Sequence, residues 1–301
     1  MLRFLTALST LIFLFSCSTT QQLGTSIPFK TGDNLTYKSM QKTTTEIDMM
    51  GIPQKVSGTQ GSTYSYAVTG MDADKNVMLD VTTTAMQMEQ VTPMMTIRYD
   101  SENPEKNEPK EMLGGLDELI GTTFKVQLDP KGKIISTQGA DELVDKMVKE
   151  NPQMASAKEL IKSQLNATGG MNFLTGFYPD RPVKIGDTWT KTDTVQAQFA
   201  MLAKKTYTLQ ERSGGQSVIT FKSELSPLDD SGMEMQGMKI SYDLKGDSKG
   251  TISVNDKTGM LVKMEEKTKL GGEMKMSGGP IGEMATNMKI AIENTFEQVD
   301  Q

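Results

Sequence analysis

The chain has 301 residues, a formal net charge of −6, one cysteine and no histidine. It therefore cannot build a Ser-His-Asp or Cys-His catalytic arrangement or an internal disulfide, and the usual zinc sites lose their main ligands. The acidic balance argues against nucleic acid as a partner. We expect one large domain or two intimate halves that hold no cofactor and catalyse no reaction.

Residues 1–16 have the proportions of a secretory signal peptide, because Arg3 is followed by an apolar run that is too short to span a bilayer. The ending Leu14-Phe15-Ser16-Cys17 resembles the lipobox of bacterial lipoproteins, in which the cysteine thiol forms a thioether with diacylglycerol. The resemblance implies cleavage before Cys17, lipidation of Cys17 and a polar tether over residues 17–26. A plain secretory signal that happens to contain a cysteine is the alternative.

The residues that follow Cys17 bear on the location of the protein. No acidic residue stands beside the cysteine or forms a run after it. By resemblance to known sorting rules, this favours a lipid-anchored protein of the outer membrane that faces the periplasm.

Apolar and polar residues then alternate with a period of two through most of the chain, as in strands with one buried face. Alternation at 64–68 and 77–81, on either side of the turn-forming residues 70–76, predicts a hairpin. A further strand is predicted over 91–99. The charged, proline-containing segment 100–111 is expected to be an exposed loop.

Residues 140–166 break this rhythm, because their apolar residues are spaced as on one face of a helix. Asn151-Pro152 is typical of a helix start, and Gly169-Gly170 is typical of a helix end. We predict a helical hairpin or kinked helix within 140–176 that packs across a sheet face.

Strand patterns return after this segment. One long strand is predicted over 195–209, and the turn 213–215 connects it to a strand at 219–225. Further strands are predicted over 238–244 and 288–296.

A weak internal repeat relates the two parts of the chain. The segment Lys30–Thr36 is similar to Lys184–Thr190, since each carries a Gly-Asp turn before a strand, and 121–134 is similar to 250–261. We interpret the chain as two related β halves, 27–139 and 177–301, joined by the helical segment 140–176. The predicted fold class is α+β and mostly antiparallel β: a curved sheet or half-barrel with the helical segment packed on it.

Methionine is unusually frequent, with 24 residues, and several methionines lie two positions apart. On a strand such pairs project from one face, about 6.6 Å apart. They can be ordinary core, the lining of an adaptable apolar cavity, or a soft-metal site for Cu(I). The candidate cavity-lining residues are Met86, Met88, Met201, Met233, Met235, Met274 and Met276.

Three features carry a resemblance to a known family: the lipobox at Cys17, the turn Gly186-Asp187-Thr188-Trp189, and the segment that leads into it from Tyr178-Pro179 through Pro182-Val183-Lys184. In these features the chain resembles uncharacterised lipoproteins of Bacteroidota-type bacteria, a family that implies no activity and no catalytic residues. At the level of fold, strands curving over a helix are similar to the periplasmic lipoprotein carriers and the mycobacterial lipid-binding lipoproteins. Those proteins hold acyl chains in a half-barrel.

The sequence therefore favours a membrane-anchored binding or carrier protein with an apolar cavity for a lipid or another apolar small molecule. One alternative is a structural or interaction protein of the cell envelope with a filled core, whose protein partner the sequence does not identify. Another is Cu(I) binding through the methionines.

Overall fold

Thirteen strands form one antiparallel sheet in the computed structural model, which describes residues 23–24, 26–49, 52–110, 113, 115–150, 174–196, 200–228, 232–235, 238–278 and 283–299. The helices that lie wholly within these residues are α1 (Ala140–Glu150) and the short 3₁₀ helices Pro104–Lys106 and Asp117–Leu119. The strands are β1 (Asn34–Met49), β2 (Ile52–Met71), β3 (Val77–Val91), β4 (Thr96–Asp100), β5 (Thr123–Leu128), β6 (Ile134–Gln138), β7 (Thr188–Gln196), β8 (Ala200–Ser213), β9 (Gln216–Pro227), β10 (Gly232–Met235), β11 (Met238–Asn255), β12 (Leu261–Ser277) and β13 (Met284–Gln298).

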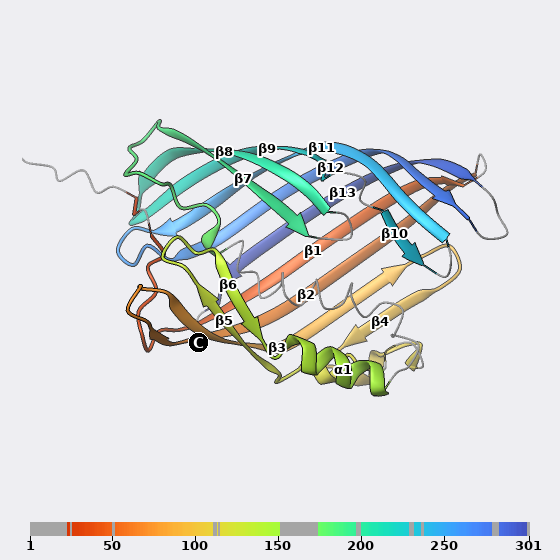
Figure 1. Ribbon diagram of the computed structural model, residues 1–301, viewed down its shortest axis with the longest axis horizontal. Helices are drawn as coiled ribbons and strands as arrows, with labels where there is room; N and C mark the ends of the chain where they lie inside the picture. The colour runs from red at the N-terminus through yellow and green to blue at the C-terminus, as the bar shows by residue number, and fades with distance from the viewer. Residues whose placement is uncertain are drawn as a thin grey trace, which may run out of the picture.

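The strand order places the first strand, β1, beside the last strand, β13. The main path runs β6-β5-β3-β2-β1-β13-β12-β11-β9-β8-β7, while β4 pairs with β3 and β10 pairs with β11. Figure 1 shows the sheet curling, so that the edge strands β6 and β7 lie in front of the central strands β1 and β13. The predicted curved and mostly antiparallel sheet is confirmed.

Alternation along each long strand separates an inner, buried face from an outer, exposed one. On β12 the side chains of Met264, Glu266, Thr268 and Leu270 are buried, while the residues between them are exposed. The inner face therefore carries the hydrophobic core of the sheet.

Two predicted strands are each interrupted by a chain reversal. The strand predicted over 91–99 is confirmed over 96–99, in β4, but its start is wrong, since β3 ends at Val91 and a turn intervenes in which the Thr92 amide donates to the Met95 carbonyl at 2.9 Å. The strand predicted over 195–209 is confirmed over 200–209, in β8, but it is not continuous, because Gln196 of β7 pairs with Ala200 of β8 across a hairpin. A period of two continues through a tight reversal, so periodicity alone does not reveal it.

The repeated Gly-Asp turns have the same hydrogen bonds. Gly32 and Gly186 have φ values of 92° and 88°, in the left-handed region that glycine adopts without strain. The Asp33 amide donates to the Lys30 carbonyl at 3.0 Å, and the Asp187 amide donates to the Lys184 carbonyl at the same distance. In each turn the aspartate carboxylate accepts from the backbone amide of the preceding lysine, at 2.7 Å and 3.1 Å respectively. The division of the chain into two related halves remains a prediction.

One end of the inner face is filled by a large hydrophobic core. Two segments outside the main sheet path pack on the strands there: residues 23–29, through Leu23, Ile27 and Phe29, and residues 174–183, through Phe177. The Trp189 Nε1 donates to the Phe177 carbonyl at 2.9 Å, which joins β7 to this covering segment. We call this region the closed end of the sheet.

The helix α1 begins at Ala140, where the helical pattern predicted it. Its residues Leu143 and Met147 are buried against Phe124 of β5, so α1 packs on the sheet at Phe124, and Figure 1 shows the helix along the lower side of the molecule below β3 and β4. Helical structure is confirmed over 140–150, and the remainder of the predicted helix, residues 151–173, lies outside the described part of the chain.

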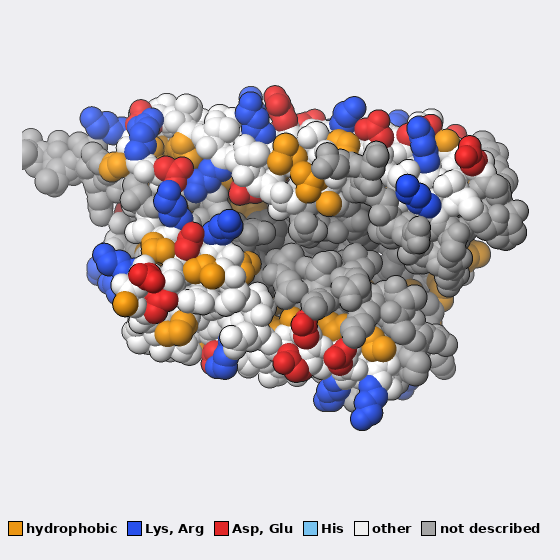
Figure 2. Space-filling model, in the orientation of Figure 1, with side chains coloured by type: hydrophobic (Ala, Val, Ile, Leu, Met, Phe, Trp, Pro, Cys, Tyr) orange, Lys and Arg blue, Asp and Glu red, His pale blue; other side chains and the backbone are white. Residues whose placement is uncertain are grey.

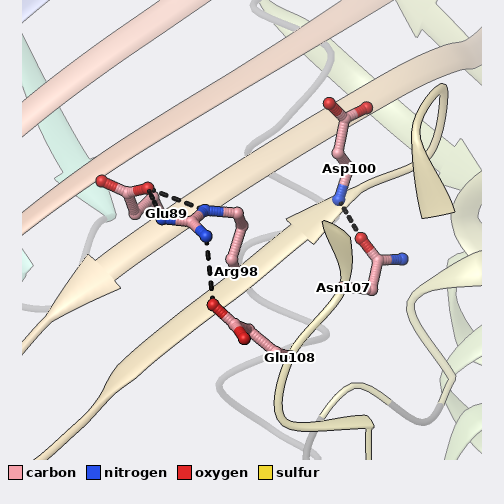
Figure 3. Close-up of polar contacts among 5 residues, drawn as sticks. All are labelled: Glu89, Arg98, Asp100, Asn107 and Glu108. Atoms are coloured by element: carbon pink, nitrogen blue, oxygen red, sulfur yellow. Dashed lines mark hydrogen bonds and ion pairs between the residues drawn. The ribbon is translucent and has the colours of Figure 1, made fainter. Parts of the chain in front are cut away.

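The loop predicted over 100–111 folds against β4 through polar contacts (Figure 3). Arg98 donates from Nε and Nη2 to Glu89 Oε2 at 2.9 Å and 2.8 Å, and from Nη1 to Glu108 Oε1 at 3.0 Å. The Asp100 amide donates to Asn107 Oδ1 at 2.7 Å. These bonds hold the loop to the strand without an apolar core of its own.

Glycines allow the strands of the second half to approach closely and the sheet to curve. A Cβ on Gly246 or Gly250 of β11 would lie 1.9 Å or 2.1 Å from a backbone carbonyl oxygen of β12, and a Cβ on Gly272 of β12 would lie 1.9 Å from the Asp243 carbonyl of β11. No side chain larger than hydrogen fits at these positions, and such glycines are the usual means of bending a sheet.

Candidate ligand-binding face of the sheet

The inner face is divided into three zones along the strands. The closed end lies at one side, and a second apolar cluster lies at the other. We call this second cluster the apolar shelf; its buried members are Met201, Leu244, Leu270, Met288 and Ile290. Polar side chains occupy the inner face between the two zones, and we call them the polar belt.

The strand register defines the polar belt as two adjacent cross-strand rows. The first row runs through the paired residues Lys191, Lys205, Ser223, Ser248 and Thr268. The second row runs through Glu266, Asn294, Gln41 and Gln60. Four members are buried, with exposed fractions of 3% for Ser223, 2% for Ser248, 7% for Glu266 and 8% for Thr268, whereas Gln41 and Gln60 at the far end of the second row are exposed. Buried polar side chains in the middle of a sheet face are unusual, because apolar side chains would fill the same positions at lower cost.

An ion pair lies at the centre of the belt. Lys205 Nζ lies 3.3 Å from Glu266 Oε1, and the Ser248 hydroxyl donates to the same oxygen at 2.8 Å. The side chains of Lys205 and Glu266 are only 19% and 9% exposed. Desolvation offsets most of the attraction in such a pair, and apolar replacements of both partners are often neutral or stabilising. The pair therefore adds little net stability to the fold.

Aromatic rings support the lysine from the side of the closed end. Lys205 Nζ lies 5.1 Å from the centroid of the Phe221 ring, within the range of a cation–π contact. Phe221 lies over Gly250 on the neighbouring strand, where a Cβ would come within 2.6 Å of the ring. Tyr207 stacks on Trp189 with ring centroids 5.4 Å apart. Each ring comes from a different strand, so the lysine is positioned by the sheet itself.

A small cavity of about 20 Å³ opens beside the ion pair. This volume suits about one water molecule, so the cavity is far too small for an acyl chain. It lies at the boundary between the closed end and the polar belt, and its lining consists of Phe177, Lys205, Tyr207, Phe221, Ile252, Met264 and Glu266.

The apolar shelf differs from the closed end in what packs on it. Every described member of the shelf lies on a strand of the sheet, and so do the half-buried residues that pack against it, such as Leu225, Met274 and Ile292. At the closed end, by contrast, covering segments supply Phe29 and Phe177. Among the described residues, the shelf is thus a single apolar layer beside a polar belt.

The candidate methionines divide between two places. Met201 is buried in the shelf and Met274 packs against it, while Met276 lies half-buried two residues further along β12. Met86 and Met88 belong instead to a separate cluster with Tyr99 of β4.

The other two candidates lie on β10, where Met233 pairs with Ile240 and Met235 with Met238, but their side chains fall outside the described residues. The methionine cavity therefore stays a prediction.

Charges of both signs are interspersed on the described surface seen in Figure 2. Near the belt, burial first and then the charges of Asp193 and Glu266 raise the pKa of Tyr207, so its hydroxyl stays protonated and able to donate.

The described residues contain no group of three or more potential metal ligands of the His, Cys, Asp or Glu type. They also contain no helix that is long and apolar enough to cross a bilayer.

The polar belt is not among the sites predicted from the sequence. The alternation of apolar and polar residues nevertheless contains a sign of it. Lys205 stands at an inner position between Ala203 and Tyr207, and Glu266 stands at an inner position between Met264 and Thr268 on β12. A charged residue at the apolar phase of a strand marks a place where the buried face carries polar groups.

The fold and this face define a β-rich protein with one open, curved antiparallel sheet. The chain belongs to a family described as "Family of unknown function (DUF6263)", which it matches over residues 74–261, more than half of its length. The expectation of an uncharacterised family is thereby confirmed. No curated protein matches the chain.

The likeness to solved structures is distant, as two of them show. The first, described as "Lipid-protein interactions in lipovitellin", has a TM-score of 0.49 and 11% identity. That match covers 90% of this chain but only 25% of the lipovitellin chain, so this chain spans a quarter of that protein's length. The second, a complex of Salmonella typhi OmpF with daunomycin, has a TM-score of 0.21 and 8% identity, covering 89% of this chain and 98% of that one. Neither likeness is close enough to bear on function.

Proposed function

We propose that the chain is a lipoprotein of the cell envelope, anchored through Cys17, that carries a lipid-like amphiphile on the inner face of its sheet and catalyses no reaction. The observation that supports the carrier function is the adjacency of the apolar shelf and the polar belt on the inner face of the sheet. An amphiphile needs one surface for its chain and one for its head, and these two zones adjoin along β8, where Met201 belongs to the shelf and Lys205 to the belt.

The energetics of the belt support the same proposal. A face that served only as a core would gain stability from apolar residues in place of Glu266 and Lys205, since burying a charge costs free energy even when it is paired. Retaining the pair is reasonable where a polar ligand group has to be accommodated next to apolar surface.

The second candidate function is that of a structural or interaction protein of the envelope. The filling of the closed end favours it, because Phe29 and Phe177 pack directly on the strands there and the adjoining cavity holds little more than a water molecule. This candidate requires the shelf to be as solidly packed as the closed end.

Native mass spectrometry of the protein purified from its own membrane tests the carrier function. We expect a bound amphiphile that survives purification and is released by organic extraction. Leu225→Trp, which adds bulk at the half-buried margin of the shelf, should lower its occupancy severalfold, whereas the neighbouring outer-face change Glu224→Gln should not. An empty protein that also takes up no added fatty acid would support the filled-core alternative.

The anchor is tested separately. Cells given an alkyne-tagged fatty acid should label the wild-type protein, and Cys17→Ala should remove both the label and the association with membranes. Unlabelled protein that is nevertheless cleaved and released would support the plain secretory signal.

A further inference from the structure

Two lysines face each other on the inner surface at the β7 edge of the sheet. Lys191 of β7 and Lys205 of β8 are directly paired in the register, and both stand at inner positions, because Trp189 and Tyr207 on the same strands point into the core. Directly opposed side chains have Cβ atoms about 5 Å apart, so two lysines at such positions can reach the same small anion in front of the sheet.

Among the described residues, the charges around this pair leave one lysine without an ion-pair partner. Glu266 and the Phe221 ring engage Lys205, whereas Lys191 takes part in none of the described ion pairs and is half-buried. Asp193 follows on the same face of β7, one pair nearer the shelf, but its side chain is exposed and forms no described ion pair either. An anion placed between the lysines would supply the counter-charge that Lys191 lacks among the described residues.

We propose that Lys191 and Lys205 bind the anionic head group, a carboxylate or a phosphate, of the amphiphile whose apolar chain lies on the shelf. This inference rests on the proposed carrier function and assigns it a ligand class. Ammonium groups form charge-assisted hydrogen bonds with both kinds of oxyanion. The protonated Tyr207 hydroxyl is a further donor on the same side of the belt.

The spacing along β8 agrees with such a ligand. From Lys205 the inner positions lead through Ala203 to Met201, a buried member of the shelf. Four residues of a strand span about 13 Å, so a head group held by the lysines would place the first ten or so carbons of an extended chain over apolar surface. Because β7 is an edge strand, the head group would reach this site from the open edge of the sheet.

The test uses the full mature chain, residues 17–301, produced without its signal and therefore without lipid. Binding of dodecanoate, dodecyl phosphate and dodecanol is measured by titration below their micelle concentrations, with inorganic phosphate as a fourth ligand. We expect both anionic amphiphiles to bind roughly tenfold more tightly than the alcohol, as for one charge-assisted contact. Lys191→Gln should remove most of this preference, while Asp193→Asn should enlarge it by relieving repulsion.

Matched controls separate charge recognition from loss of structure. Lys204→Gln removes a lysine from the exposed, outer face of β8 and should leave the preference unchanged. Lys205→Gln alone would leave the buried Glu266 carboxylate without its counter-charge. Lys205 is therefore tested in the double variant Lys205→Gln/Glu266→Gln, which should also lose the preference.

The outcomes distinguish this inference from the function on which it rests. Equal binding of all three amphiphiles, unaffected by Lys191→Gln, would overturn the head-group assignment and leave the carrier function standing. Binding of none would remove both. Inorganic phosphate that binds as tightly as dodecyl phosphate would identify an anion site that does not recognise an amphiphile, and so would also overturn the inference.

Discussion

Tyr37 and Tyr66 pack edge-to-face at the closed end with ring centroids 5.7 Å apart, yet only one of their hydroxyls has a partner among the described residues. Tyr37 Oη donates to the Leu261 carbonyl at 2.8 Å, a bond that joins positions 224 residues apart in the chain. Tyr66 Oη is buried and makes no hydrogen bond within the described part of the chain. Both side chains are fully buried, so burial alone does not distinguish them.

This difference predicts opposite results for the same substitution. Tyr37→Phe should lower the free energy of unfolding by about 1–3 kcal/mol, because it leaves the buried Leu261 carbonyl without its donor. Tyr66→Phe should be neutral or stabilising, since it removes a buried hydroxyl that makes no hydrogen bond. Urea denaturation of both variants measures the difference, and equal destabilisation would contradict the assigned hydrogen bonds.

All seven tyrosines should resist ionisation in the native protein, because burial is the largest cause that raises the pKa of each above the ordinary value of 10.0. Their contribution to stability is fully present below pH 10 and is lost as the pH rises beyond it, since the unfolded chain ionises first. Absorbance at alkaline pH should show little tyrosinate until the protein unfolds. A native protein that titrates normally near pH 10 would contradict the burial of these rings.

The close approach of β11 and β12 predicts a severe effect at Gly250. Gly250→Ala should cost at least about 3 kcal/mol, because the new Cβ would meet both the Glu265 carbonyl and the Phe221 ring. Gly58→Ala is the control, since its Cβ would lie an ordinary 3.7 Å from the Glu89 carbonyl, and it should be neutral or slightly stabilising. Thermal unfolding of the two variants compares them directly.

The belt ion pair should be strongly non-additive. Lys205→Met alone should destabilise by about 1–3 kcal/mol, because it leaves the Glu266 carboxylate buried with only Ser248 as a described donor. The double variant Lys205→Met/Glu266→Leu should recover most of this loss, as replacement of both charges avoids the desolvation cost. A double-mutant cycle on unfolding free energies measures the coupling, and simple additivity of the two losses would contradict the contact.

Much of the fold follows from local patterns. The alternation around Tyr66 and Leu79 predicts paired strands because each position reports which side of a strand is buried. The Asp33 and Asp187 turns are equally local, since each carboxylate binds a backbone amide three residues away. Chain reversals such as the turn at Thr92 cannot be predicted from the alternation, because both arms of a hairpin keep the same period of two.

By itself, the sequence determined that this protein is mostly β, that it has one helical segment after residue 139, and that turns punctuate its strands at glycine and aspartate. Only the tertiary structure decided that β1 lies beside β13 and that Lys205 meets Glu266, 61 residues further along the chain. Periodicity and turn chemistry depend on neighbours within a few residues, whereas these pairings depend on how the whole sheet closes and in which register. The polar belt exists only in that register, because its members come from eight different strands.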